Sequence, residues 1–429
     1  MFSCFSKSRH PRQVLVINIG DELLDGLNTN GHLTWLGEHL ARRGLAISRS
    51  VVLRDNLQEI AQELRTSWGL YDVIVTTGGI GPTTDDHARE AAATALGLSL
   101  EHVPKAEAAL RERFAKLGRT VSEQDLRQCY VPTGAEAVDN PRGTAPGIFL
   151  AKDERILIML PGPKLELQPM FENEIVPRLR SCGCACQGEA YVQVRTYGIG
   201  AVPLEKIIRP LLKPGMVLTF GTHTGVVDAR ISSGGNGATA EELCEVARKV
   251  RDTLGPDFVC TGHACLASLV VEQLRCLEKT VAIAESCTGG LLANAFTDIP
   301  GASKVFAGSV VSYTNDAKVN ILGVPECLLA QHGAVSAECA IAMATAAAEK
   351  FGSEYALSVT GYAGPGGGTE ADPVGTIYFG YASPTGVWSQ RVVLIGDRGQ
   401  VKLRAVNTAL DWMRRNLHKY RVEDLIHGS

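Results

Sequence analysis

The chain has 429 residues, of which 45% are hydrophobic and 21% are charged. This length and balance are typical of a globular protein with roughly two to four domains and real apolar cores. Its 42 Lys and Arg residues against 46 Asp and Glu residues give a net charge of −4. That charge provides no basis for nucleic acid or an anionic membrane as the main partner.

No apolar run of the sequence reaches the roughly 20 residues that span a bilayer. Residues 1–12 are basic but lack the apolar stretch of a signal peptide, so we expect a short disordered leader. The twelve cysteines form no C-x-x-C pair, and the run Cys182, Cys184 and Cys186 has no second ligand cluster at zinc-site spacing. These features predict a cytoplasmic protein with reduced thiols and no membrane partner.

Strand-like and helix-like segments alternate in the first part of the chain. Buried-strand patterns cover residues 14–19, 47–53, 71–83 and 155–162, and helical spacing covers residues 34–45, 57–69 and 86–97. Strands that alternate with helices through short loops indicate a parallel sheet with helices on both faces. We therefore predict an α/β domain over residues 13–170.

The pattern changes after residue 170. Strand candidates cover residues 191–200, 216–222 and 225–232, and helical segments cover residues 204–212 and 240–255. Together they predict a small α+β linker module over residues 171–258.

The last segment, residues 262–419, again combines helices and strands. Helical patterns cover residues 265–279, 289–298, 337–352 and 397–417, and strand patterns cover residues 281–286, 305–314, 355–361, 375–383 and 387–395. This segment is expected to be a second large α/β domain, which makes the whole chain an α/β multidomain protein.

The first glycine loop lies in TTGGIGPTTDD, residues 76–86, directly after a strand pattern. Its glycines are Gly78, Gly79 and Gly81. Ligands of open α/β sheets bind outside the carboxyl ends of the strands, and glycine lets backbone N–H groups approach a phosphate. We therefore predict a nucleotide site at this loop.

Several carboxylates accompany this loop. Asp85 and Asp86 follow it at the expected start of a helix, where one of them could serve only as the N-cap. Glu22 and Asp55 follow the ends of two other strand patterns. Because carboxylates beside a phosphate commonly hold a Mg²⁺-type ion, these four residues are the predicted metal ligands.

VAIAESCTGG, residues 281–290, places two possible nucleophiles, Ser286 and Cys287, where a strand passes into a helix. The N–H groups of Gly289 and Gly290 and the helix N-terminus are expected to favour the negative charge that develops when an amide is attacked. Alternatively, Ser286 is only the helix N-cap. A thiol at a helix N-terminus can have a lowered pKa, but no histidine partner for Cys287 is apparent, so the serine is the preferred nucleophile.

A serine nucleophile needs a base. Lys318 in SYTNDAKV is the better candidate than His332, because a desolvated lysine can lose its proton near neutral pH; otherwise Lys318 is a solvated surface residue. Tyr313 could relay a proton or hold the lysine, or be an ordinary half-buried strand residue. Thr360 ends a strand, and its hydroxyl could bond the carboxamide or the serine, or only cap the strand end.

Two further features suit a phosphorylated substrate. The loop GYAGPGGG, which contains Gly364 and Gly366, suits a phosphate or another closely packed ligand. Arg398 in GDR is expected to bind the phosphate, because a guanidinium group binds phosphate in a bidentate way. Alternatively, Arg398 forms a salt bridge with Asp397 at the start of the last helix.

These motifs occur in an order that resembles the CinA family. Five stretches resemble its amino-terminal molybdopterin-binding-like domain: IGDELLDG, NTN at 28–30, RDN at 54–56, TTGGIGPTTDD and NPRGTAPG at 140–147. Six stretches resemble its carboxy-terminal domain: AESCTGG, the block at 299–324, HGAVS at 332–336, VTGYAGPGGG, PVGTIYFG and GDR. Together they cover most of the chain.

The resemblance implies two activities. The amino-terminal domain would be an ADP-ribose pyrophosphatase that gives AMP and ribose 5-phosphate with a divalent metal (Mg, Mn or Co), and its nucleotide site would include Thr83 and Asn30. The carboxy-terminal domain would be a nicotinamide-nucleotide amidase without a metal. Ser286 and Lys318 would form its catalytic pair, and Thr288 would be among its substrate-binding residues.

Two positions depart from the family pattern, since Ala201 replaces the usual Glu and Lys402 replaces a frequent second Arg. The alternative hypothesis is a non-catalytic nucleotide- or pterin-binding protein that acts in competence or the DNA-damage response. Direct nucleic-acid binding is not expected, because the sequence has no basic stripe interleaved with aromatic residues. The expected partners are nicotinamide mononucleotide, ADP-ribose and a second copy of the chain in a homodimer.

Overall fold

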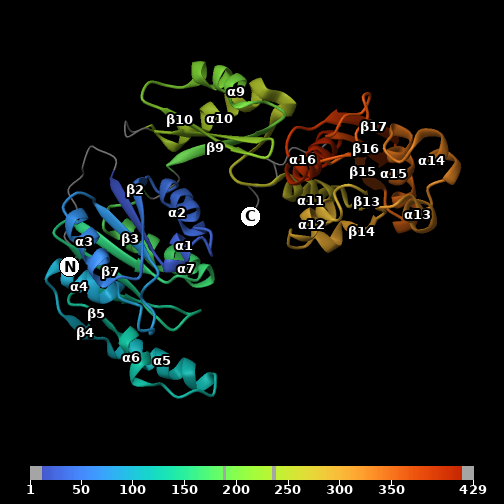
Figure 1. The fold of residues 1–429 in the computed structure, drawn as a ribbon. Helices are drawn as coiled ribbons and strands as arrows, with labels where there is room; N and C mark the ends of the chain where they lie inside the picture. Colours follow the sequence, from blue (N-terminus) through green and yellow to red (C-terminus); the bar gives the residue numbers. More distant parts are fainter. Residues whose placement is uncertain (1–11, 187–189, 234–237, 418–429) are drawn as a thin grey trace. The chain divides into compact units, whose positions relative to one another are not determined.

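The structure is a computed structural model that describes residues 12–186, 190–233 and 238–417 (Figure 1). All but the last residue of the predicted leader lies outside this part of the chain. The described residues form two compact units. The first holds those up to Tyr191 with residues 214–217 and 232–243, and the second holds the rest. Within the described ranges, no helix combines the length and the apolar character that a membrane crossing requires.

The first unit is built on a six-stranded sheet with the order β2-β1-β3-β8-β7-β6. Its strands are β1 (Gln13–Ile19), β2 (Ala46–Leu53), β3 (Val73–Thr77), β6 (Glu136–Val138), β7 (Gly147–Lys152) and β8 (Arg155–Leu160). The first four strands in this order pair in parallel, whereas β7 and β6 are antiparallel. The predicted α/β class is confirmed. The antiparallel edge was not predicted, because β6 has only three residues and carries no clear apolar alternation.

Helices cover both faces of this sheet. Val14 and Val16 of β1 lie in one core with residues of α2 (Gly31–Ala41), α7 (Lys164–Met170) and α8 (Val176–Ser181). Leu15 and Ile17 lie in the other core with residues of α3 (Leu57–Ser67) and α4 (Ala88–Leu96). Because successive strand residues point to opposite faces, one apolar run serves two cores.

The structure moves the domain boundary that was predicted at residue 170. α7 continues through a π-helical segment, Phe171–Ile175, directly into α8. Phe171, Ile175 and Leu179 are completely buried in the first unit's core. The helical run after residue 170 therefore belongs to the first unit, whose first segment extends to Tyr191.

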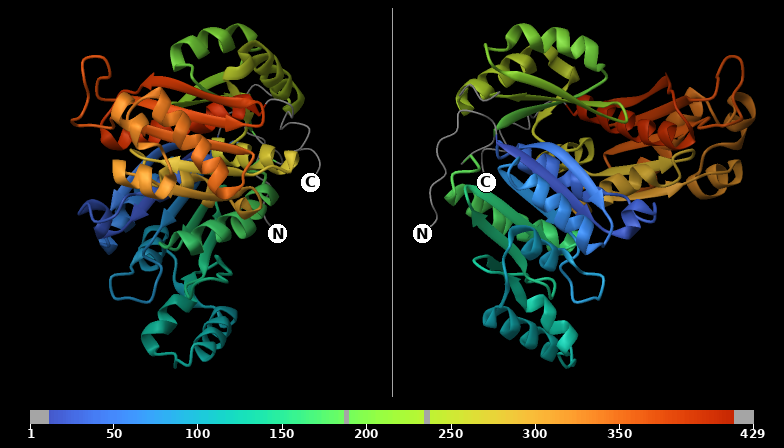
Figure 2. Two further views of the ribbon diagram at one scale, coloured as in Figure 1. Left: turned by 90° about the vertical axis from the view of Figure 1, so that its right-hand side faces the viewer. Right: turned by 60° about the vertical axis from the view of Figure 1, so that its left-hand side comes forward.

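Residues 100–132 form an excursion that no sequence pattern predicted. β4 (Leu100–His102) and β5 (Tyr130–Pro132) pair antiparallel, and α5 (Pro104–Lys116) and α6 (Glu123–Leu126) lie between them in the chain. Leu110, Phe114 and Cys129 form its own small core. Figures 1 and 2 show α5 and α6 standing apart from the six-stranded sheet.

A four-stranded sheet with the order β10-β11-β9-β12 follows. It consists of β9 (Tyr191–Tyr197), β10 (Val217–His223), β11 (Val226–Ser232) and β12 (Phe258–Thr261), accompanied by α9 (Ala201–Ile208) and α10 (Ala240–Leu254). Most of it belongs to the second unit. The Tyr197 hydroxyl bonds Thr408 at 2.7 Å, and Arg195 donates to the carbonyl of Ala264 at 2.9 Å. The predicted linker module is thus joined to the last domain rather than free-standing.

The last domain has a five-stranded sheet with the order β14-β13-β15-β16-β17. Its strands are β13 (Val281–Glu285), β14 (Phe306–Val311), β15 (Tyr355–Gly361), β16 (Thr376–Ser383) and β17 (Gly386–Val393). The first three strands in this order are parallel and the last two antiparallel. The helices are α11 (Leu266–Leu277), α12 (Leu291–Thr297), α13 (Asn315–Ala317), α14 (Glu326–His332), α15 (Ala337–Phe351) and α16 (Arg398–Asn416).

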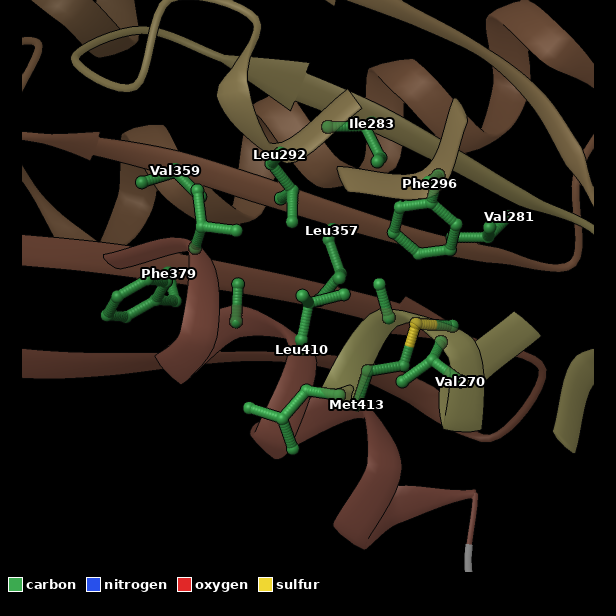
Figure 3. Packing of buried hydrophobic residues seen from close by; sticks show 14 of the residues in the cluster. Val270, Val281, Ile283, Leu292, Phe296, Leu357, Val359, Phe379, Leu410 and Met413 are labelled. Carbon is green, nitrogen blue, oxygen red and sulfur yellow. The ribbon is translucent and has the colours of Figure 1, made fainter. Parts of the chain in front are cut away.

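The two faces of this sheet carry side chains of different size. Large residues such as Ile283 and Leu357 face α11, α12 and α16, as Figure 3 shows. Ala282 and Ala284 face the Ala-rich α15. The helix approaches so closely that a Cβ on Gly380 would lie 2.2 Å from the carbonyl oxygen of Ala340. Small residues on both sides therefore set the distance of α15 from the sheet.

Candidate active site

Ser286 lies in a tight turn between β13 and α12. The turn contains two consecutive glycines in the left-handed region, Gly289 at φ +63° and Gly290 at φ +97°, which other residues rarely adopt. The N–H of Ser286 donates to the carbonyl of Val359 at 2.9 Å, so the nucleophile is fixed to the neighbouring strand β15. Only 8% of Ser286 is exposed. The turn therefore holds the serine at the carboxyl edge of the sheet.

Lys318 reaches this serine from the segment after β14. Its Nζ lies 3.0 Å from the Oγ of Ser286 and 2.8 Å from the carbonyl oxygen of Ser312. Lys318 opens a π-helical turn, Lys318–Leu322, a geometry that is frequent at functional sites. The structure thus brings together two predicted site residues that are 32 positions apart in the sequence.

The surroundings of Lys318 favour its neutral amine, which is the form that a general base needs. It is 1% exposed, and burial lowers its pKa from the usual value of 10.5. The nearest titratable groups that act on it are the thiols of Cys339 and Cys287. Because a lysine with a lowered pKa carries more neutral amine near pH 7, Lys318 can accept the proton of Ser286.

Cys287 lies beside the serine but is not activated. Burial raises the pKa of its thiol to about 12, which leaves it protonated at neutral pH. A thiol in that state is a poor nucleophile. The structure therefore favours Ser286 over Cys287 as the nucleophile.

The glycine N–H groups are not free, contrary to expectation. The N–H of Gly289 donates to the carbonyl of Ser286 at 3.1 Å, and the N–H of Gly290 donates to the carboxylate of Glu285 at 3.0 Å. The N–H groups of Cys287 and Thr288 have no acceptor in the part of the chain that the structure describes. Thr288 is completely buried, and its hydroxyl has no partner there either.

Arg398 joins two of the predicted loops at the start of α16. Its guanidinium donates to the carbonyl of Gly364 at 2.6 Å and to the hydroxyl of Tyr313 at 3.1 Å. Tyr313 is 58% exposed, so it is not the half-buried strand residue of the alternative interpretation. Its hydroxyl contacts Arg398. Asp397 caps α16 through its bond from the N–H of Gln400, so it is not the salt-bridge partner of Arg398.

Lys402 lies one turn further along the same face of α16, at the i+4 position from Arg398. Its Nζ would lie 3.9 Å from a Cβ on Gly289, which places it next to the serine turn. Neither cation has a carboxylate partner within the described residues. Two cations without a counter-charge beside the nucleophile favour an anionic substrate.

The remaining predicted residues of this domain have structural contacts. The hydroxyl of Thr360, which is buried, donates to the carbonyl of Ala334 at 2.7 Å and not to Ser286. Gly366 is exposed in its loop. His332 ends α14, with Nδ1 3.6 Å from the carboxylate of Glu338. Lys318, which the sequence analysis preferred to His332 as the base, is the residue that contacts Ser286.

The first glycine loop lines a cavity of about 340 Å³ at the carboxyl ends of β1 and β3. Gly78, Gly79 and Gly81 contribute to its wall, as do all four predicted metal ligands, Glu22, Asp55, Asp85 and Asp86. Asn30 is not among the lining residues. Its side chain accepts the N–H of Leu33 at 3.3 Å and caps α2 instead.

Asp55 in this cavity is affected by the neighbouring carboxylates. Burial raises the pKa of Asp55, and the charges of Asp21, Asp85 and Glu22 raise it further. Crowded carboxylates of this kind suit a hard divalent cation. However, no three metal-binding side chains converge at ligating positions within the described residues. The carboxylate oxygens are therefore ligands that suit a divalent ion, but in this structure they do not converge on one metal position.

Asp86 and Arg89 hold the glycine loop in place. The Asp86 carboxylate accepts the N–H of Thr83 at 2.8 Å and also bonds its hydroxyl, while α4 begins only at Ala88. Asp86 therefore closes a turn and does not cap the helix. Arg89 is buried and donates to the carbonyls of Ile80 and Gly81. No sequence signal indicated this role, since an arginine in a helical pattern is usually solvated.

The fold and these two sites define an α/β multidomain protein with a buried serine–lysine pair and a separate carboxylate-lined glycine loop. Residues 263–417 match the family model described as "CinA C-terminal domain". Residues 15–181 match the model described as "Probable molybdopterin binding domain".

Relatives match over nearly the whole chain. A CinA-like protein of Geobacter metallireducens is 37% identical over 406 residues, which are 94% of this chain and 98% of that protein. A CinA-like protein of Syntrophomonas wolfei is 36% identical over 407 residues, with the same coverage. A solved structure, the competence/damage inducible protein CihA from Agrobacterium tumefaciens, is 39% identical over 34% of this chain and 91% of its own, with a TM-score of 0.34. The chain belongs to the CinA family.

Proposed function

We propose that the last domain hydrolyses the carboxamide of nicotinamide mononucleotide to nicotinate mononucleotide and ammonia. The observation that carries this proposal is the 3.0 Å contact between Lys318 Nζ and Ser286 Oγ, both of which are buried. A serine with a desolvated lysine at hydrogen-bond distance is the arrangement that activates a hydroxyl without histidine.

The reaction follows from the positions of these groups. Ser286 Oγ attacks the carboxamide carbon and passes its proton to Lys318, and the resulting ammonium then protonates the amide nitrogen, which leaves as ammonia when the C–N bond breaks. Water hydrolyses the acyl-enzyme by the same proton route. The N–H of Cys287, which has no acceptor among the described residues, is our candidate donor to the developing oxyanion. This chemistry requires no metal.

The substrate's phosphate is assigned to the cations of α16. Arg398 and Lys402 share one face of the helix, and both reach the neighbourhood of the serine turn. The exposed Tyr313 hydroxyl adds a polar contact at the same place. These groups would hold the 5′-phosphate and orient the carboxamide toward Ser286.

The direct test is ammonia release from nicotinamide mononucleotide by the full chain and by two single variants. Activity in the wild type and in Cys287→Ala, with a loss of roughly 10³-fold or more in Ser286→Ala, is the expected result. Loss in Cys287→Ala alone would make the enzyme a thiol amidase and refute the serine–lysine mechanism.

For the first unit we propose an ADP-ribose pyrophosphatase that uses a divalent metal such as Mg, Mn or Co. The position of Glu22, Asp55 and Asp85 in the wall of the cavity that the glycine loop lines supports it. These carboxylates would hold the ion, which would supply charge neutralisation at the diphosphate. A binding role in competence or DNA damage without turnover is the alternative, and measured AMP release from ADP-ribose separates the two.

A further inference from the structure

The side chain of Glu285 makes an unusual set of contacts for a residue next to a nucleophile. Glu285 ends β13 and is completely buried. Its carboxylate accepts the N–H groups of Gly290 at 3.0 Å, Leu292 at 3.0 Å and Ala293 at 2.8 Å. No cation within the described residues forms an ion pair with it. Both oxygens are therefore committed to the backbone that follows the nucleophile.

The main chain of the same residue holds the base. The carbonyl of Glu285 accepts the N–H of Ser312 at 2.8 Å, and the carbonyl of Ser312 accepts Lys318 Nζ at 2.8 Å. Glu285 thus connects to the serine turn through its carboxylate and to the lysine through one residue, Ser312. A displacement of this residue would change both halves of the catalytic pair.

We propose that Glu285 is a positioning residue for the hydrolytic reaction. Its carboxylate holds the turn from Ser286 to Gly290 in the shape that presents Ser286 to Lys318, and its carbonyl fixes Ser312, whose own carbonyl accepts the Nζ of Lys318. This inference rests on the proposed amidase function.

The contacts of Lys318 show why this main-chain path matters. The carbonyl of Ser312 is the only backbone oxygen that Lys318 Nζ contacts within the described residues. The titratable groups that act on Lys318 are the thiols of Cys339 on α15 and of Cys287. An ammonium at this position is therefore stabilised by its hydrogen bond to Ser312 and not by an ion pair.

The test compares Glu285→Gln with a matched control, Glu354→Gln, in the full chain. Glu354 lies directly before β15, and its carboxylate accepts the N–H of Thr280 at 3.1 Å and the hydroxyl of Thr280 at 2.8 Å. It therefore also ties backbone to the same sheet, but at the start of β13 and not at its Ser286 end. The probe is a small fluorophosphonate. It forms a phosphorus–oxygen bond with Ser286 and releases fluoride, while Lys318 takes up the hydroxyl proton. Intact mass measures the rate of labelling across pH.

The expected result for Glu285→Gln is labelling at least about 30-fold slower than the wild type, with the pH midpoint shifted to lower pH. The direction follows because a displaced Glu285 weakens the contact between the carbonyl of Ser312 and Lys318 Nζ, which favours the ammonium. Glu354→Gln should keep the wild-type rate and midpoint. Glu285→Asp, which retains the carboxylate but is one methylene shorter, should also label slowly, and it carries the test if the Gln variant does not fold.

Wild-type rate and midpoint in a folded Glu285→Gln or Glu285→Asp protein would overturn the proposal and leave Glu285 as a structural cap. Absence of Ser286 labelling in the wild type itself would overturn the proposed amidase function, and with it this inference. The two failures are distinguished by the wild-type reaction alone.

Discussion

Lys318 shows how burial alone turns an ordinary side chain into a base. It has no carboxylate partner within the described residues, and its Nζ contacts only a hydroxyl and a carbonyl oxygen. An ammonium in such surroundings is poorly solvated, so its proton is easily lost. The burial of Lys318 therefore favours its role as a base but lowers the stability of the folded protein.

The first prediction concerns the loss of the base. Lys318→Met should lower the rate of ammonia release by roughly 10³-fold, because the proton of Ser286 then has no acceptor. Lys304→Met, an exposed lysine of the same domain, should leave the rate unchanged and serves as the control. Turnover in Lys318→Met within about threefold of the wild type would refute the assignment.

The second prediction concerns stability and pH. A lowered lysine pKa in the folded state means that the unfolded chain binds more protons between that pKa and 10.5, so stability rises with pH across this window. Lys318→Met should therefore be more stable than the wild type at pH 7, on the order of 1 kcal/mol, and the difference should shrink as the pH approaches 10.5. Thermal unfolding at several pH values measures this, and a less stable variant at pH 7 would contradict it.

At the scale of elements, strand and helix patterns were informative where the apolar period was clear. The pattern at residues 281–286 corresponds to β13, and the pattern at residues 355–361 to β15. The excursion with α5 and α6 was missed because its helices are polar and pack on only a few apolar side chains. The boundary at residue 170 was misplaced because the change of sequence pattern after that residue suggested an end, whereas the helical run continues into the first core.

The candidate site was predicted only in part, because its residues lie far apart in the sequence. Ser286 could be found from its strand-to-helix position, but its contact with Lys318 depends on the parallel pairing of β13 and β14. Glu285 was missed because an acid at the end of an apolar strand resembles the start of a polar loop. Asn30 was assigned to the nucleotide site from resemblance, whereas local geometry uses it as a helix cap.

The third prediction concerns the contact between α15 and the sheet. Gly380→Ala would place a Cβ 2.2 Å from the carbonyl oxygen of Ala340 and 2.5 Å from Ser358 Oγ, so the helix must shift. We expect a loss of stability of about 1–3 kcal/mol, seen as a lower midpoint in denaturant. Gly366→Ala has open space at its Cβ position and should unfold like the wild type. Equal midpoints for the two variants would show that α15 does not pack as described.

At the scale of the whole molecule, the two reactions that we propose for the two units differ in their need for a metal. The fourth prediction is that EDTA abolishes the release of AMP from ADP-ribose and leaves ammonia release from nicotinamide mononucleotide within about twofold. Asp55→Asn should imitate EDTA in the first reaction only. Loss of both activities with EDTA would contradict a metal-free serine–lysine mechanism.

The fifth prediction separates an enzyme from a DNA-binding protein. With a net charge of −4, the chain should not shift duplex or single-stranded DNA in a gel at physiological salt. A shift that weakens steeply as salt increases would contradict this prediction and support the role in competence or DNA damage.

Helix α16 connects the serine turn with the segment around the start of β12. Its first turns hold Arg398 and Lys402 beside the serine turn, and its last turn holds Arg414 and Arg415. Arg414 donates to the carbonyl of Phe258, and Arg415 pairs with Asp257, both in the segment that leads into β12.

Buried Asp411 aligns both of these arginines, through bonds of 2.6 Å to each. A helix of 19 residues is about 28 Å long, so α16 connects this segment to the two cations to which we assign the phosphate. Asp411→Asn, which loosens the far end of the helix, is expected to raise the KM for nicotinamide mononucleotide more than it lowers kcat, and an unchanged KM would contradict such a connection.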